Sequence, residues 1–221
     1  MISKPTIYST LKHEIGPDVT LVAVSKTKPT DQILELYVKG QRAFGENYVQ
    51  ELIEKQALLP DDIQWHFIGH LQTNKVKYIA PFVHLIHGID SLKLLKEVNK
   101  EAVKNKRSIN VLLQIHIAQE ETKFGLNEQE LEALITELQE QPLLHVKIIG
   151  MMGMASFSED TEQVRREFHY LKDLFNRYQS IHLPNFELKQ LSMGMSSDYK
   201  IALSEGSTMI RIGSLLFGSR S

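Results

Sequence analysis

The sequence predicts one domain, residues 1–221, folded as an α/β barrel of the (β/α)8 TIM type with an extra N-terminal helix. Short runs rich in valine, isoleucine and leucine alternate with longer amphipathic stretches, and eight such runs occur along the chain. Strands that alternate with helices pair in parallel through right-handed crossovers. Near-continuous apolar strands suit a sheet covered on both faces, and eight units suffice to close a barrel. A doubly wound open sheet is the alternative.

The predicted strands share short runs of β-branched and aliphatic residues. Each run ends where glycine, proline, serine, aspartate or asparagine interrupts it. In chain order they are residues 19–26, 42–46, 63–70, 83–90, 109–118, 145–155, 186–195 and 208–218.

The predicted helices carry apolar residues at spacings of three and four and have recognisable ends. The first has Ser3 as its cap, Pro5 in its first turn and a Gly-Pro pair at 16–17 as its end. The other helices are residues 30–40, 47–59, 73–82, 91–107, 127–141, 161–179 and 197–206. No helix is expected after the last strand, so the N-terminal helix is expected to fill that gap in the outer ring.

Composition narrows the class of protein. A formal net charge of -2 with 24% charged residues argues against a dedicated nucleic-acid binder. The absence of cysteine excludes disulfides, thiolate metal sites and cysteine nucleophiles. The N-terminus lacks the apolar core of a signal peptide, and no stretch approaches the roughly 20 apolar residues that span a bilayer. We therefore expect a cytoplasmic protein that binds neither nucleic acid nor membranes.

Lys26 is the leading candidate for chemistry. Strand alternation places Val22, Val24 and Lys26 on one side of the first strand. If that side faces the barrel interior, Lys26 lies at its upper rim, where a low dielectric lowers the pKa of the amine and frees it to attack an aldehyde. The alternative is a solvated lysine at the strand exit. Lys28 shares the phase but lies against a proline.

Arg211 is the second unusual residue, because it interrupts an apolar strand with a guanidinium that needs hydrogen-bond acceptors. Gly213 and Ser214 follow it, and Ser196 and Ser197 follow the preceding strand. Barrels often bind phosphate with the loops after strands seven and eight. An amine, an embedded arginine and a phosphate site together indicate a phosphorylated aldehyde as ligand.

Two further groups of residues carry weaker signals. His66 and His70 have the spacing of a metal pair, but no glutamate lies between them as in a zincin helix, so packing or hydrogen bonding is favoured. Met151, Met152 and Met154 are expected in the core, although one of them could lie against a flat ring.

Six sequence blocks, in order, resemble the signature blocks of the pyridoxal phosphate homeostasis proteins. The resemblance runs from Leu21 to Gly218 and implies the fold of the N-terminal barrel of alanine racemase, without that enzyme's second, β-rich domain. The blocks are "VAVSKTKP", "FGENYVQE", "WHFIGHLQTNK", "IDS", "LSMGMSSD" and "IRIGSLLFG".

The resemblance implies a site for pyridoxal 5′-phosphate built from seven residues. Lys26 would form a Schiff base with the cofactor, and Arg211 would face the pyridine nitrogen. Asn47 would lie near the ring. The phosphate would be held by Ser196, Gly213, Ser214 and, less firmly matched, Ser197. The block "GMMGMA" departs from the commoner leucine-containing version, so it leaves open which methionine contacts the ring.

The resemblance also implies what the protein does. A positively charged arginine keeps the pyridine nitrogen unprotonated and so weakens the ring as an electron sink. Alanine racemase completes its site with a tyrosine base from its second domain, and nothing in the spacing of Tyr48 or Tyr199 makes either a positioned base. We therefore expect a non-catalytic, monomeric binding protein for vitamin B6 homeostasis and amino-acid balance, with apo-enzymes that use the cofactor as partners. The alternatives are a cofactor-dependent amino-acid racemase and an aldolase that uses Lys26 directly on a phosphorylated sugar.

Overall fold

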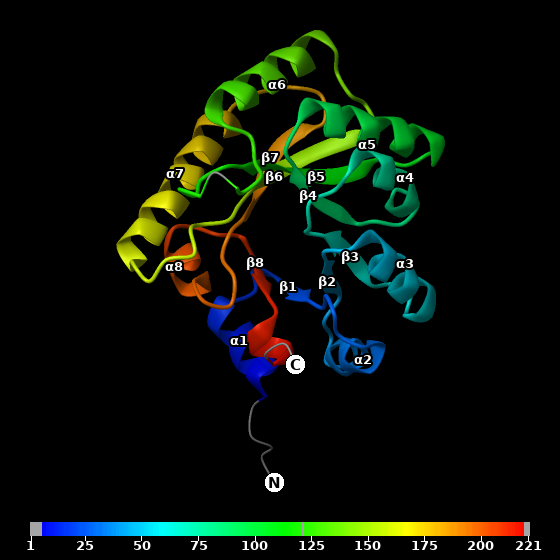
Figure 1. Ribbon diagram of the computed structural model, residues 1–221, viewed down its shortest axis with the longest axis vertical. Coiled ribbons are helices and arrows are strands. Elements are labelled where there is room, and N and C mark those ends of the chain that lie inside the picture. Colours follow the sequence, from blue (N-terminus) through cyan, green and yellow to red (C-terminus); the bar gives the residue numbers. More distant parts are fainter. Residues whose placement is uncertain (1–5, 121, 219–221) are drawn as a thin grey trace.

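A computed structural model describes residues 6–120 and 122–218, in which eight parallel strands close into one barrel in chain order (Figure 1). Strand β8 pairs with β1, joining Arg211 to Val22 in register. The predicted (β/α)8 barrel is confirmed, and the open sheet is wrong. The strands are β1 Thr20–Val24, β2 Ala43–Glu46, β3 Gln64–Phe67, β4 Leu85–Ile89, β5 Ile109–Ile115, β6 Val146–Gly153, β7 Phe186–Ser192 and β8 Met209–Ile212.

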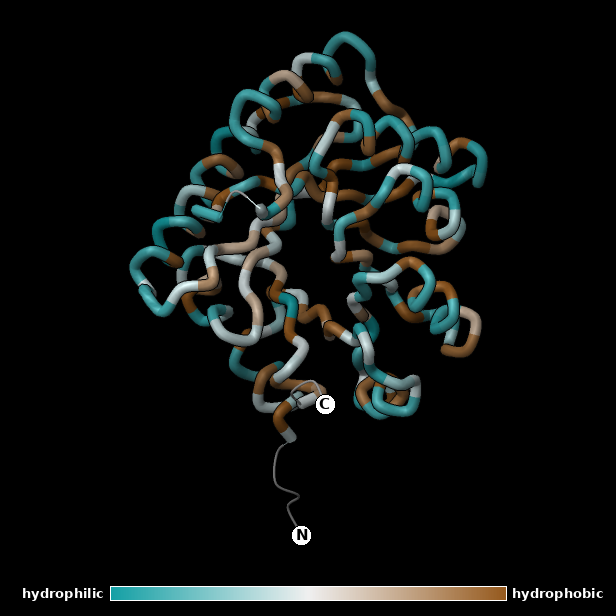
Figure 2. The backbone as a smooth tube through the Cα atoms, viewed as in Figure 1, coloured by the Kyte–Doolittle hydropathy of each residue, from teal (hydrophilic) through white to brown (hydrophobic). Residues whose placement is uncertain are grey.

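Helices surround the barrel and turn their apolar sides toward it. In Figure 2 hydrophobic and hydrophilic segments alternate along the larger helices, as expected for helices with one buried side. Residues 73–79 form a short 3-10 turn, η1 Thr73–Lys75, followed by a single helical turn, in place of the longer predicted helix. The α-helices are α1 Ile7–Ile15, α2 Thr30–Val38, α3 Val49–Leu58, α4 Val76–Ile79, α5 Leu92–Lys104, α6 Glu128–Glu140, α7 Thr161–Gln179, α8 Tyr199–Ser204 and α9 Ser214–Phe217.

Helix α1 covers the outer wall of the barrel where β8 meets β1. Leu11 and Ile15 pack in one buried cluster with Leu21 of β1 and with Ile210 and Ile212 of β8. The expected place of the N-terminal helix is therefore confirmed. The predicted cap and first turn, residues 3 and 5, lie outside the described residues, and the described helix is capped by residue 6.

Several predicted strands extend beyond the observed ones. The most consequential error is the strand predicted over 208–218, because β8 ends at Ile212 and a short helix, α9, follows it. Leu215 and Leu216 continue the apolar run, so apolar content alone could not separate the strand from the helical turn. Gly213 precedes α9 as its N-cap. The correction places Ser214 at the start of a helix rather than inside a strand.

The barrel interior is a small apolar core of its own. It contains Val22, Ala43, Leu85, Leu112, Met152 and Met209. Valine 22 is fully buried there, which confirms that the valine side of β1 faces inward. A larger cluster fills the space between the strands and the helices. Across the described residues, no helix has the length and apolar character needed to cross a membrane.

Candidate functional site

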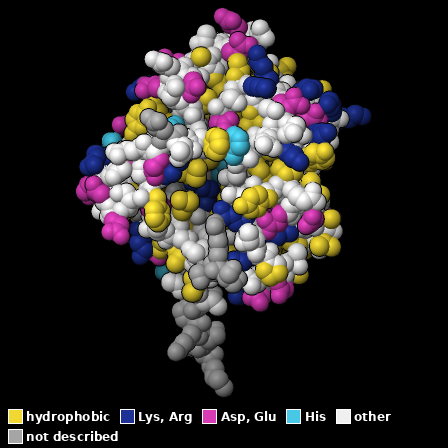
Figure 3. Space-filling model, in the orientation of Figure 1, with side chains coloured by type: hydrophobic (Ala, Val, Ile, Leu, Met, Phe, Trp, Pro, Cys, Tyr) yellow, Lys and Arg dark blue, Asp and Glu magenta, His cyan; other side chains and the backbone are white. Residues whose placement is uncertain are grey.

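A pocket of about 680 Å³ lies at the carboxyl ends of the strands, centred on β8 and β1. The face of the molecule drawn in Figure 3 is hollowed near its centre, with lysine and arginine side chains at the hollow. All of the residues predicted for the site line this single pocket. They are Lys26, Asn47, Ser196, Ser197, Arg211, Gly213 and Ser214.

Lys26 is half-buried and lies in a turn two residues beyond the end of β1. The next residue, Thr27, has a φ of 63°, a left-handed conformation that a threonine adopts only where its surroundings impose it. The backbone on either side of Lys26 is held by helix α3. The Lys55 ammonium donates to the Ser25 carbonyl at 2.7 Å, and the Thr27 N–H donates to Glu51 Oε1 at 2.6 Å. The conformation of the turn is therefore tied to α3.

A buried ion-pair network lies directly beneath this turn. The Lys55 ammonium is 2.7 Å from Oε1 of Glu46 and 2.7 Å from Oε1 of Glu51, and the Ser25 hydroxyl donates to the same Glu46 oxygen at 2.6 Å. The side chain of Glu46 is 0% exposed and that of Lys55 is 7% exposed. Burial raises the pKa of Glu46, against the lowering effect of its hydrogen bond from Lys55.

This network was not predicted from the sequence. The signal that could have found it is a glutamate closing the otherwise apolar strand "AFGE", because a buried carboxylate requires a partner. Its partner, Lys55, lies on the helix that follows.

Arg211 lies at the floor of the pocket and is 4% exposed. Its Nη1 donates to the carbonyl oxygen of Ser192 at 2.9 Å and to the Ser192 hydroxyl at 2.6 Å, and its Nη2 donates to the carbonyl of Gly153 at 3.1 Å. Within the described part of the chain, no carboxylate lies within ion-pairing distance, 4.0 Å, of this guanidinium. Burial lowers the pKa of Arg211 to about 10, so it remains a cation near neutral pH.

The β7–α8 and β8–α9 loops bring small donors together on the other side of the pocket. The Gly213 N–H donates to the Ser196 hydroxyl at 3.3 Å, which joins the two loops. Helix α9 begins at Ser214 without a side-chain cap, so the N–H groups of Ser214 and Leu215 have no acceptor within the helix. Two loops and a short helix in this position are the usual phosphate-binding arrangement of a barrel.

Glycine is required at position 194, just before the serines. Gly194 has a φ of 95°, and a Cβ there would lie 2.6 Å from the Cβ of Ala202 on α8. The chain at the end of β7 therefore passes close against α8, and a side chain at position 194 would displace the loop that carries Ser196.

The structure distinguishes the three methionines that the sequence left open. Met154 lines the pocket, whereas Met151 packs between the barrel and the helices and Met152 packs in the barrel interior. Neither tyrosine considered as a base lines the pocket. The Tyr199 hydroxyl donates to Glu14 of α1 at 3.0 Å, and Tyr48 is 58% exposed.

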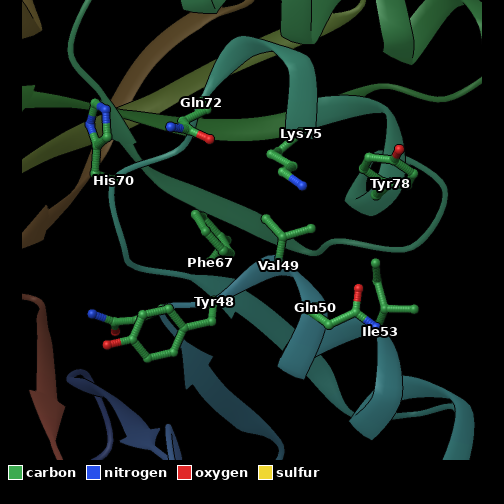
Figure 4. A pocket seen from close by; sticks show the side chains of 10 residues that line it. Tyr48, Val49, Gln50, Ile53, Phe67, His70, Gln72, Lys75 and Tyr78 are labelled. Carbon is green, nitrogen blue, oxygen red and sulfur yellow. The ribbon is translucent and has the colours of Figure 1, made fainter.

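A second pocket, of about 470 Å³, adjoins the first and shares Asn47 with it. In Figure 4 the side chain of Lys75 reaches from the η1 segment toward the start of α3, with Gln72 and Tyr78 on either side. The Asn47 Oδ1 atom is buried and accepts no hydrogen bond from the described residues. Asn47 therefore lines both pockets with an amide oxygen that is available to a ligand.

The two histidines with metal-like spacing lie in different environments. His66 is buried inside the barrel, with its Nδ1 2.9 Å from Nε2 of His87 on β4. His70 lies beyond the end of β3, 3.1 Å from an oxygen of Asp90, with its ring stacked on Phe124. Among the described residues, no group of three or more histidine, aspartate or glutamate side chains is placed to hold a metal ion. Both histidines instead have hydrogen-bond partners.

The buried histidines predict a pH dependence of stability. Burial lowers the pKa of His66 to about 3, and it lowers the pKa of His87 well below the usual value. The unfolded chain takes up protons on these rings below about pH 6.5 and the folded chain does not, so the free energy of unfolding falls as the pH falls. We expect each ring to contribute a loss of about 2 kcal/mol between pH 7 and pH 5.

Urea unfolding of the His87→Gln protein at these two pH values measures one ring's share. The loss of stability between pH 7 and pH 5 should be smaller than in the natural protein by about 2 kcal/mol. The exposed His182 provides a control, because His182→Gln should leave the difference unchanged. An unchanged pH dependence in His87→Gln would show that the ring is already charged in the folded protein.

Comparisons with known proteins agree with the geometry of the pocket. Residues 8–221 match the family model described as alanine racemase, N-terminal domain. The pyridoxal phosphate homeostasis proteins of Aquifex aeolicus and Haemophilus influenzae are 43% and 38% identical to this chain. The matches cover 90% and 92% of this chain, respectively, and 86% of each relative. The structure of PipY from Synechococcus elongatus PCC7942 with PLP bound is 36% identical with a TM-score of 0.87, and the match covers 96% of this chain and 98% of PipY.

Proposed function

The chain belongs to the pyridoxal phosphate homeostasis proteins, within the alanine racemase N-terminal domain family, and on this premise we propose that it binds pyridoxal 5′-phosphate and buffers its supply without a reaction of its own. The observation that best supports this proposal is the composition of the pocket around Arg211. A buried guanidinium, with no carboxylate within 4.0 Å in the described residues, forms the floor of a pocket that also holds an amine and a cluster of N–H and hydroxyl donors. A phosphorylated aromatic aldehyde complements all three.

The residues present fit the cofactor. The Lys26 amine would hold its aldehyde, Arg211 its ring nitrogen, and Ser196, Ser197, Gly213 and Ser214 its phosphate. Asn47 and Met154 would border the ring. Bound pyridoxal 5′-phosphate supplies an electron sink for amines, and a cationic partner at the ring nitrogen weakens that sink. Arg211 remains a cation near neutral pH, and Asp198 favours its charged form, so the guanidinium would favour this weak state.

The placement of the two tyrosines considered as bases supports storage over turnover. Tyr199 is hydrogen-bonded to α1, Tyr48 faces the neighbouring pocket, and neither lines the pocket that contains Lys26. An amino-acid racemase remains the competing function, and solvent deuterium tests it. The loaded protein in D2O should exchange the α-hydrogen of amino acids no faster than the free cofactor does. Exchange at enzymatic rates would establish the racemase instead.

The binding itself is tested by adding pyridoxal 5′-phosphate to purified protein and reducing with borohydride. We expect a visible absorption band before reduction and an equimolar adduct on the peptide that contains Lys26 after it. A protein that stays colourless and unmodified contradicts the proposal. Trapping of a phosphorylated sugar aldehyde on Lys26, with no trapping of the cofactor, would favour the aldolase.

Ser196→Ala tests the phosphate site. Hydrogen bonds to a charged group contribute about 1.5–3 kcal/mol, so we expect the dissociation constant for the cofactor to rise by a factor of roughly 10 to 100. Pyridoxal, which lacks the phosphate, should bind both proteins equally. Ser180→Ala on the exposed end of α7 serves as the control. Equal affinity of the Ser196→Ala and natural proteins for the phosphorylated cofactor would remove Ser196 from the site.

The same function gives further expectations about partners and assembly. Apo-enzymes that use the cofactor are the proposed recipients, and we propose a monomeric, single-domain cytoplasmic protein. Transfer is measured by mixing loaded protein with an apo-enzyme and following the return of enzyme activity. Light scattering of the purified protein gives its mass in solution, which should correspond to one chain.

A further inference from the structure

A chain of hydrogen bonds runs through the barrel interior beneath the pocket. It starts at Arg211, whose Nη1 is 2.6 Å from the Ser192 hydroxyl, and continues 3.3 Å from that hydroxyl to Nδ1 of His87. Nε2 of His87 then lies 2.9 Å from Nδ1 of His66. All four side chains are buried, on strands β8, β7, β4 and β3. The pocket floor is thus linked to two histidines that no proposed contact with the cofactor uses.

The donors in this chain run in one direction. A guanidinium only donates, so the Ser192 oxygen accepts from Arg211 and its own proton is available to His87. If His87 donated to Ser192, the hydroxyl proton would have no acceptor among the described residues. Nδ1 of His87 is therefore the acceptor, and the neutral ring carries its proton at Nε2. That proton is donated to Nδ1 of His66, so His66 carries its own proton at Nε2, an atom that has no partner among the described residues whichever way the chain runs. Both rings are neutral, because burial disfavours their charged form.

The direction matters for Arg211. A hydroxyl that donates to one partner becomes a better acceptor toward another, so His87 strengthens the bond that Ser192 accepts from the guanidinium. The Ser192 carbonyl accepts from the same nitrogen, Nη1, at 2.9 Å. Nη1 thus donates to two oxygens of Ser192, and His87 fixes the orientation of the hydroxyl. Together these contacts restrict Nη1 to one position. If Ser192 had no acceptor for its proton, the hydroxyl could rotate away from Arg211.

We propose that His87 is a positioning residue, backed by His66, whose hydrogen bond orients Ser192 and thereby holds Arg211 at the pocket floor. The effect on the cofactor rests on the proposed function, whereas the direction of the hydrogen bonds does not. Burial of two histidines merely as packing would require neither a fixed tautomer nor any effect on ligand affinity.

The first experiment needs no cofactor. Nitrogen-15 NMR of the histidine-labelled protein at pH 7 distinguishes the tautomers of each ring through its long-range couplings. We expect both His66 and His87 as neutral rings protonated at Nε2. A ring of His87 protonated at Nδ1, or charged, would reverse the direction of the chain and overturn the inference.

The second experiment uses the cofactor and two variants of similar size at position 87. His87→Leu removes the acceptor for Ser192, and His87→Gln restores one through its amide oxygen. We expect His87→Leu to weaken binding of pyridoxal 5′-phosphate about tenfold and His87→Gln to recover most of it, because the contact from Arg211 is charge-assisted. Leu85→Val, a change in the same interior layer of β4, controls for packing alone.

The outcomes distinguish a failure of cofactor binding from a failure of the positioning role of His87. If the natural protein fails to bind the cofactor, the proposed function is wrong, and the NMR result alone decides the tautomers. If the natural protein binds the cofactor and His87→Leu binds it as tightly as the Leu85→Val control, the positioning role is wrong. Equal weakening in His87→Leu and His87→Gln would likewise assign the histidine to packing and overturn the inference.

Discussion

Lys26→Ala is expected to abolish the borohydride-stable adduct and to weaken retention of pyridoxal 5′-phosphate on the order of 100-fold, equivalent to about 2.7 kcal/mol. The amine of Lys26 is the group that would hold the aldehyde, and alanine offers no nucleophile in its place. The phosphate donors and Arg211 remain, so weak, reversible binding should persist. Absorbance titration measures that affinity, and mass spectrometry of the reduced protein measures the adduct.

Lys28→Ala is the matched control, because Lys28 lies in the same turn and lines the same pocket. The Lys28 ammonium donates to the carbonyl of Phe217 at 3.1 Å, which engages it with the end of α9. We expect Lys28→Ala to keep the equimolar adduct. An adduct that survives Lys26→Ala and disappears in Lys28→Ala would transfer the covalent role to Lys28.

The order of the elements and the membership of the pocket could be predicted because both depend on local signals. Apolar runs and their polar ends place Lys26, Asn47 and Ser196 after three different strands, and a closed barrel brings such ends together. The phase of β1 predicts that Val22 points inward. The resemblance added what periodicity cannot supply, namely the ligand's identity and the match of Arg211 to its ring nitrogen.

The missed features depend on contacts between residues distant in sequence or on competition between similar local patterns. The end of β8 was misplaced because "SLLF" is apolar enough for a strand, whereas Ser214–Phe217 forms a helical turn in the structure. The pairing of His66 with His87 joins two strands, and no spacing within either strand indicates it. The choice of Met154 over Met152 depends on the irregular register of β6 and on where that strand ends.

The ion pair beneath the Lys26 turn shows most clearly why a site needs more than the residues that touch its ligand. Neither Glu46 nor Lys55 lines the pocket, yet Lys55 holds the carbonyl that precedes Lys26, and Glu51 holds the N–H that follows it. Thr27, whose N–H is the second of these anchors, has a left-handed backbone conformation that is energetically unfavourable for a β-branched residue. The turn should therefore relax when the anchors are removed, taking the Lys26 amine with it.

Lys55→Met is accordingly expected to lower the free energy of unfolding by about 3–5 kcal/mol, because it leaves the Glu46 carboxylate buried without its cation. Lys100→Met removes an exposed partner of Glu97 and should cost less than about 1 kcal/mol. Urea unfolding at pH 7 compares the two. A loss as small as that of the control would mean that the buried pair contributes no more than a surface pair.

The double variant Glu46→Gln with Lys55→Met separates stability from positioning. Without a carboxylate to bury, much of the lost stability should return, since the penalty of Lys55→Met lies in the unpaired charge. The anchor on the Ser25 carbonyl does not return, because methionine cannot donate to it. We therefore expect the double variant to fold stably and still form the Lys26 adduct more slowly than the natural protein. Adduct formation at the natural rate would show that α3 stabilises the barrel without positioning Lys26.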